Sequence, residues 1–118
     1  MATPKWRIRL GDEAEKDFVR ILERTRERFG ERQVEIYKAT LLDALAALEG
    51  GPNILGSAAR DEILPGLRSL HVARHRHRGR HFVMYRAGAD RVIEVVRILQ
   101  DAMDLARHVP KQADDDAE

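Results

Sequence analysis

Cysteine is absent from this 118-residue sequence, and aromatic residues make up only 5% of it. Without cysteine, the chain can form neither a disulfide framework nor a thiolate metal site. No apolar run approaches the roughly 20 residues that a membrane helix needs, and no signal peptide is visible. We therefore expect a cytoplasmic protein with no membrane partner.

The composition is otherwise that of a folded domain, with 43% hydrophobic residues, 35% charged residues and a formal net charge of +1. Such a balance is typical of globular chains rather than disordered ones, and the length suits one domain with a single core. We expect this domain to span residues 1–110. The acidic residues from Asp114 to Glu118 predict a disordered tail over residues 111–118.

The first half of the chain predicts one strand and two helices. Residues 6–10 alternate apolar and basic side chains, which is typical of a short half-buried strand. Asp12 is expected to be the N-cap of a helix that ends at Gly30, and a second helix is expected from Glu31 to about Leu48. The short joint makes the pair an antiparallel hairpin. The apolar stripe predicted for the first helix comprises Ala14, Phe18, Ile21, Leu22, Thr25 and Phe29.

The second half predicts three more strands, over residues 67–72, 81–86 and 91–99, with an irregular loop over residues 53–61. Their β-branched content and the turns between them favour an antiparallel meander. The fold class is therefore α+β: an N-terminal strand, an antiparallel helical hairpin, and a three-stranded antiparallel meander forming one small sheet.

A cationic run crosses this meander, since neither Asp nor Glu occurs between Arg68 and Arg86. Clustered arginines without interleaved acids favour a surface that binds an anionic partner. No carboxylate lies near the histidines of the run in the sequence, and the arginines would repel a cation, so we expect no metal and no cofactor. The run contains Arg68, Arg74, Arg76, Arg78, Arg80 and Arg86, with His71, His75, His77 and His81 among them.

Three further positions stay open at this stage. Arg97 interrupts an apolar strand and is either a solvent-facing residue or a cation on the working face of the sheet. Glu94 differs from it in strand parity, so the two should project to different faces and not pair. Tyr85 shares parity with Val83 and is either a core residue or a functional one.

Four fragments of the chain resemble the RelE/ParE superfamily of bacterial toxins from type II toxin–antitoxin pairs. The resemblance runs from about residue 6 to residue 109, is closer to the ParE branch, and implies the fold described above. The fragments are Pro-Gly-Leu-Arg-Ser-Leu (65–70), Gly-Arg-His-Phe-Val-Met-Tyr-Arg (79–86), Val-Val-Arg-Ile-Leu (95–99) and Met-Asp-Leu-Ala-Arg-His (103–108).

The resemblance implies a toxin, of the kind associated with plasmid stabilisation, that a cognate antitoxin neutralises in a hetero-oligomer. Such antitoxins often carry a ParD-like ribbon-helix-helix part, so DNA would be contacted only through the antitoxin. ParE-like toxins poison DNA gyrase without being enzymes. Many of them carry His where this chain has Gln100, so a chain whose toxicity has been lost is also considered. The residues expected to bind the target or antitoxin are Arg68, Arg74, Arg76, Arg78, Arg80, Arg86, Arg97, Met103 and Asp104.

The alternative is a RelE-like, ribosome-dependent mRNA endoribonuclease. RNA cleavage needs cations on the phosphate and groups that move protons. RelE relatives that cleave place a His or Tyr near the end of the last strand, where this chain has Gln100 and Asp101. That difference favours the non-enzymatic gyrase poison. The nuclease set would be Arg68, Arg80, His81 and Arg97, with Arg74 as a further cation.

Overall fold

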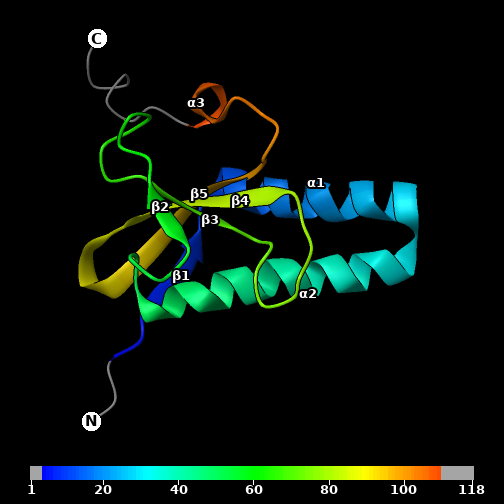
Figure 1. Ribbon diagram of the computed structural model, residues 1–118, viewed down its shortest axis with the longest axis horizontal. Helices are drawn as coiled ribbons and strands as arrows, with labels where there is room; N and C mark the ends of the chain where they lie inside the picture. The colour runs from blue at the N-terminus through cyan, green and yellow to red at the C-terminus, as the bar shows by residue number, and fades with distance from the viewer. Residues whose placement is uncertain (1–3, 110–118) are drawn as a thin grey trace.

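The computed structural model describes residues 4–109, and the tail predicted over residues 111–118 lies outside them. A helical hairpin packs on one face of a sheet, and Figure 1 shows both helices extending beyond the sheet edge. The elements are β1 (Arg7–Leu10), α1 (Asp12–Phe29), α2 (Glu31–Ala47), a 3-10 turn (Leu48–Gly50), β2 (Ser57–Ala59), β3 (Arg68–His71), β4 (His81–Ala87), a second 3-10 turn (Ala89–Arg91), β5 (Val92–Gln100) and α3 (Leu105–His108).

The sheet has five strands in the order β1-β5-β4-β3-β2. β1 pairs with β5 in parallel, and the other pairs are antiparallel. The α+β class is confirmed, and the predicted meander is present as β3-β4-β5. The meander alone is an incomplete account, because β1 and β2 extend the sheet at its two edges.

β2 overturns the prediction of an irregular loop over residues 53–61. Its sequence, Ser-Ala-Ala, has neither β-branched residues nor apolar alternation that would mark a strand. Pairing creates the strand, with Ser57 opposite Leu70 and Ala59 opposite Arg68 on β3. Because the strand conformation of β2 depends on pairing with β3, the sequence of residues 57–59 alone does not predict it.

The start of α1 also differs from the prediction, since Gly11 and not Asp12 is the N-cap. The Gly11 N–H donates to the Val95 carbonyl at 2.9 Å, and the Glu15 N–H donates to the Gly11 carbonyl at 3.0 Å. The last residue that bonds to the sheet is therefore also the cap residue, which places Asp12 in the first helical turn.

The main core lies between the hairpin and the sheet, and a smaller core lies on the opposite face. Tyr85 is fully buried in the main core and donates its hydroxyl to the Pro52 carbonyl at 2.6 Å, so it is a core residue. Phe29, predicted in the apolar stripe, is instead 69% exposed. It ends α1 at the hairpin joint, where the helices project past the sheet (Figure 1).

A β-bulge in β5 corrects the parity argument for Glu94 and Arg97. Tyr85 lies opposite Val95 while Met84 lies opposite Arg97, so β5 contains one extra residue between them. The bulge puts Arg97 on the same side of the sheet as Glu94. The two still have different partners, because Glu94 pairs with Arg86 and Arg97 pairs with a residue of α1.

Candidate functional site

A groove of ≈ 600 Å³ opens between the α1–α2 hairpin, the loop before β4 and the end of β5. We call it the arginine groove. Its lining includes the apolar side chains of Ile21, Phe29, Ile98, Leu99 and Met103. Among the lining residues, Asp17 is the one acid. The cations that line it are Arg20, Arg24, Arg28, Arg80 and Arg97.

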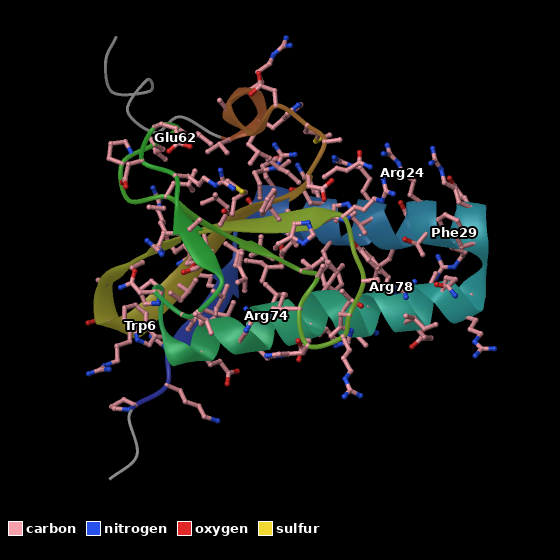
Figure 2. All side chains as sticks on the ribbon, viewed as in Figure 1. Trp6, Arg24, Phe29, Glu62, Arg74 and Arg78 are labelled. Carbon is pink, nitrogen blue, oxygen red and sulfur yellow. The ribbon has the colours of Figure 1, made fainter. Side chains whose placement is uncertain are left out.

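Three of these arginines come from α1 and were not singled out from the sequence. Arg20, Arg24 and Arg28 are spaced by four residues, which places them on one face of a helix. That spacing was the signal that could have found them. Within residues 4–109, Arg24 and Arg28 form no ion pair, and Figure 2 shows Arg24 on α1, with Arg78 on the loop between β3 and β4.

Buried Asp17 and partly buried Arg97 form an ion pair where the groove meets the sheet. Arg97 donates from Nε to Asp17 Oδ2 at 2.7 Å and from Nη2 to Asp17 Oδ1 at 3.0 Å. The Ile98 N–H also donates to Asp17 Oδ2, at 2.9 Å. The side-chain hydrogen bond to Asp17 raises the pKa of Arg97 above its usual value, so the guanidinium stays charged. A third donor of Arg97, Nη1, donates to the His108 carbonyl at 2.6 Å. Arg97 therefore links the end of α3 to β5 and α1.

Tyr37 and His81 form a second polar cluster in the groove. The Tyr37 hydroxyl lies 2.6 Å from His81 Nδ1, and the Arg80 N–H donates to the same hydroxyl oxygen at 3.1 Å. Burial lowers the pKa of His81 and raises that of Tyr37, so both groups are held neutral at pH 7. A neutral imidazole that accepts from Tyr37 at Nδ1 carries its proton on Nε2.

The remaining histidines correct one inference from the sequence, because carboxylates do lie near them in space. His75 Nδ1 is 3.4 Å and His77 Nε2 is 3.8 Å from Asp43 Oδ2 on α2, and His71 Nε2 is 2.9 Å from Asp101 Oδ2. The basic loop thus lies beside α2, and His71 of β3 contacts the residue that follows β5, while Asp43 Oδ2 itself has no hydrogen-bond partner in the described part of the chain. No group of three or more potential ligands among residues 4–109 is arranged to hold a metal ion.

Several arginines of the cationic run are engaged within the fold rather than displayed. Arg68 donates to the Pro52 carbonyl and to Ser57 Oγ, both at 2.8 Å. Arg86 donates to Glu94 Oε1 at 3.1 Å. Arg74 is half-buried, and its Nε has no hydrogen-bond partner in the described part of the chain.

The other predicted residues have three different placements. Arg76 and Arg78 are exposed on the loop before β4, outside the groove lining, while Arg80 and Met103 line the groove. Asp104 is the N-cap of α3, where its Oδ1 accepts from the Ala106 N–H at 3.2 Å. The structure therefore brings together Arg80, His81, Arg97 and Met103 of the predicted set, and places Arg68 and Arg86 elsewhere.

The family model described as the ParE toxin of the type II toxin–antitoxin system, parDE, matches residues 8–105. The chain belongs to the ParE toxin family. It is thus a ParE-type toxin of a type II toxin–antitoxin system. No helix among residues 4–109 is long and apolar enough to span a membrane.

Curated relatives and solved structures agree with this membership. Toxin ParE1 of Mycobacterium tuberculosis, in strains CDC 1551 / Oshkosh and H37Rv, is 33% identical over 103 residues, which are 87% of this chain and 97% of the relative. A chain from the chromosomal ParDE system of P. aeruginosa superposes with a TM-score of 0.62 at 17% identity, covering 83% of this chain and 98% of that one. A chain of the toxin–antitoxin complex RelBE2 from Mycobacterium tuberculosis gives a TM-score of 0.55 at 18% identity, covering 81% and 98%. At these identities the two structures show the shared fold.

Proposed function

We propose that this ParE-type toxin is neutralised by a cognate antitoxin whose acidic, amphipathic segment binds in the arginine groove. The observation that carries the proposal is the combination of five arginines with apolar side chains around one groove. Carboxylates of the partner would pair with Arg20, Arg24 and Arg28, while its apolar side chains would contact Ile21 and Phe29. The ParDE and RelBE2 structures that share the fold come from toxin–antitoxin systems, which supports a partner of this kind. We propose further that this antitoxin is ParD-like and carries a ribbon-helix-helix part.

The test substitutes the groove arginines that have no ion-pair partner among residues 4–109. Arg24→Gln/Arg28→Gln should weaken binding of the co-encoded antitoxin about tenfold or more, since each charge-assisted contact contributes on the order of 1 kcal/mol. The salt dependence of the affinity should also fall, because fewer charges meet at the interface. Calorimetric titration at two salt concentrations measures both effects.

The matched control removes two exposed arginines outside the groove, Arg32→Gln/Arg107→Gln. It makes the same change in net charge and should leave the affinity within about twofold of the wild type. Equal losses in both double variants would contradict the assignment of the groove, because they would show a response to total charge.

We also propose DNA gyrase as the target, with the chain acting in the cytoplasm as a non-enzymatic poison. Membership of the ParE family supports this proposal. The purified chain, freed of antitoxin, should inhibit supercoiling and accumulate cleaved DNA in a gyrase assay. Inhibition that requires Arg24 and Arg28 would indicate that target and antitoxin share the groove. A folded chain that leaves gyrase fully active would refute the target.

The endoribonuclease alternative is kept because of one observation. Tyr37 and neutral His81 meet beside Arg80 in the groove, and His81 lies opposite Gln100 on β5. His81, which could transfer protons, is thus next to the end of β5, where residues 100 and 101 include neither His nor Tyr. Primer extension on mRNA after induction tests this activity. Codon-phased cuts that disappear in His81→Asn would support it, and uncut mRNA in cells that stop growing would exclude it.

A further inference from the structure

One hydroxyl group of α2 holds the end of the loop that leads into β4. The Tyr37 hydroxyl oxygen accepts from the Arg80 N–H at 3.1 Å and lies 2.6 Å from His81 Nδ1. Gly79 packs so closely that a Cβ there would be 2.8 Å from the same hydroxyl. On the other side, the Asp101 N–H donates to the Arg80 carbonyl at 2.8 Å. Residues 79–81 are therefore fixed between α2 and the end of β5.

This arrangement leaves one donor of His81 without a partner. Because the Tyr37 oxygen already accepts from Arg80, its own hydrogen is donated to His81 Nδ1, and the imidazole proton is on Nε2. His81 lines the arginine groove, and its Nε2 has no hydrogen-bond partner among residues 4–109, although this atom is not buried. The Nε2–H group is thus open to a ligand in the groove.

The guanidinium of Arg80 supplies positive charge beside this neutral donor. Arg80 also lines the groove, and its side chain is exposed and forms no ion pair with an acid of the described chain. The carboxylate of Asp101, whose charge acts on His81, is itself bound to His71 Nε2 at 2.9 Å. One charged donor next to one neutral donor suits an oxyanion that carries a single negative charge.

We propose that Arg80 and the Nε2–H of His81 form a carboxylate subsite of the arginine groove, and that Tyr37 is the residue that positions both of them. The occupant is one Asp or Glu side chain of an acidic partner segment. Apolar groove residues such as Leu99 and Met103 favour a peptide over a phosphodiester strand, because a peptide carries apolar side chains beside its carboxylates. This inference rests on the proposed function in taking the partner to be acidic, and it adds a contact that the arginines of α1 do not make.

The first experiment observes His81 in the wild-type chain. A synthetic ten-residue polyglutamate peptide is the acidic probe, and the ¹⁵N shifts of the imidazole are read through its carbon-bound protons. We expect the free chain to have the His81 proton on Nε2. The Nε2 signal should move more than the Nδ1 signal as peptide is added, because only Nε2 gains a partner. A proton on Nδ1 in the free chain, or an Nε2 signal that stays in place at saturation, would overturn the proposal.

The second experiment measures the affinity for the same peptide. His81→Leu should bind it about fivefold more weakly, since one hydrogen bond to a carboxylate is lost. His81→Gln should recover most of that affinity, because the glutamine amide can donate from a similar position. Equal losses in the two variants would contradict the role of Nε2–H as a donor.

The third experiment separates positioning by Tyr37 from a general effect on the fold. Tyr37→Phe should weaken peptide binding about three- to fivefold, but it should cause no further loss in an Arg80→Gln/His81→Leu background, because Tyr37 acts through these two residues. The matched control is Tyr85→Phe, which removes a hydroxyl bonded to the Pro52 carbonyl in the main core and should stay within about twofold of the wild type. Equal losses in Tyr37→Phe and Tyr85→Phe, or a full loss from Tyr37→Phe in the double background, would overturn the positioning role.

A ten-nucleotide oligothymidylate, titrated beside the peptide, tests the identity of the oxyanion. Weaker binding of the oligonucleotide is expected. Tighter binding, with a larger loss in His81→Leu than the peptide shows, would assign the subsite to a phosphodiester and overturn the carboxylate occupant.

The two proposals fail in different ways. If antitoxin binding needs Arg24 and Arg28 but the His81 and Tyr37 variants bind the peptide as the wild type does, the groove is the antitoxin site and the subsite is refuted. If those variants lose affinity for the peptide but antitoxin binding ignores Arg24 and Arg28, the subsite binds carboxylates and the antitoxin binds elsewhere.

Discussion

The pair formed by Asp17 and Arg97 gives the sharpest test of how this fold is held together. Replacing Asp17 with Asn preserves the shape of the side chain but removes its charge and one acceptor oxygen. The new amide N–H₂ group would then face either the Arg97 guanidinium or the Ile98 N–H, both of which are donors. The substitution therefore leaves the partly buried Arg97 without its counter-charge and at least one donor unsatisfied.

The burial of the two side chains sets the expected loss in the free energy of unfolding. The Asp17 side chain is 5% exposed and that of Arg97 is 16% exposed, so neither charge is well solvated. Removing one partner of a buried pair costs about 3–5 kcal/mol. Arg97 keeps its bond to the His108 carbonyl, so we expect the lower end, about 3 kcal/mol. In a domain of this size, such a loss lowers Tm by on the order of 10 °C or more.

Urea denaturation followed by circular dichroism measures the loss, with Glu23→Gln on the same helix as the exposed control. The control should change the unfolding free energy by no more than about 0.5 kcal/mol. Asp17→Asn/Arg97→Leu should lose less than the sum of its two single variants, because it no longer buries an unpaired guanidinium. A loss below about 1 kcal/mol for Asp17→Asn would refute the structural role of the pair.

Two further predictions concern the cluster around Tyr37. Because burial lowers the pKa of His81 in the folded chain below its unfolded value of about 6.5, the unfolded state binds more protons as the pH falls. The stability that neutral His81 contributes is therefore present above pH 6.5 and lost below it. Denaturant titrations at pH 7.5 and 5.5 should show that the free energy of unfolding changes less with pH in His81→Asn than in the wild type. An equal change in both proteins would contradict this prediction. In Gly79→Ala, the added Cβ would lie 2.5 Å from a Val72 methyl and 2.8 Å from the Tyr37 hydroxyl, so we expect a loss of about 1–3 kcal/mol. Gly88→Ala, whose added Cβ would make an ordinary contact of 3.4 Å with the Val92 carbonyl, is the comparison in thermal melts. Equal stability of the two variants would show that the loop around Gly79 yields without cost.

Local periodicity was enough to predict most elements of this fold. Alternation of apolar and polar residues marks β1 and β3, β-branched and aromatic content marks β4 and β5, and the helical spacing of apolar residues marks α1 and α2. Each of these patterns depends on residues that are near neighbours along the chain. β2 has no such pattern, because its conformation comes from pairing with β3.

The sequence also predicted some residues of the candidate site and missed others. The basic character of residues 68–86 was evident, but Arg68 and Arg86 turn inward to partners that the sequence does not name. Conversely, the sequence shows the four-residue spacing of Arg20, Arg24 and Arg28 on α1, but it does not show which part of the fold these arginines face. Asp17 was also missed, because charged residues stand beside the apolar ones around it on the helix and the local sequence gives no sign that it is buried.

The sequence by itself determined the strand and helix segments, the positive loop and the acidic end, since these depend on neighbours along the chain. Only the tertiary structure decided that Arg97 meets Asp17, 80 residues away, and that α1 and the β4–β5 end enclose one groove. The physical reason is that ion pairs and grooves depend on which surfaces the topology brings together, and a single bulge in β5 is enough to move Arg97 from one face of the sheet to the other.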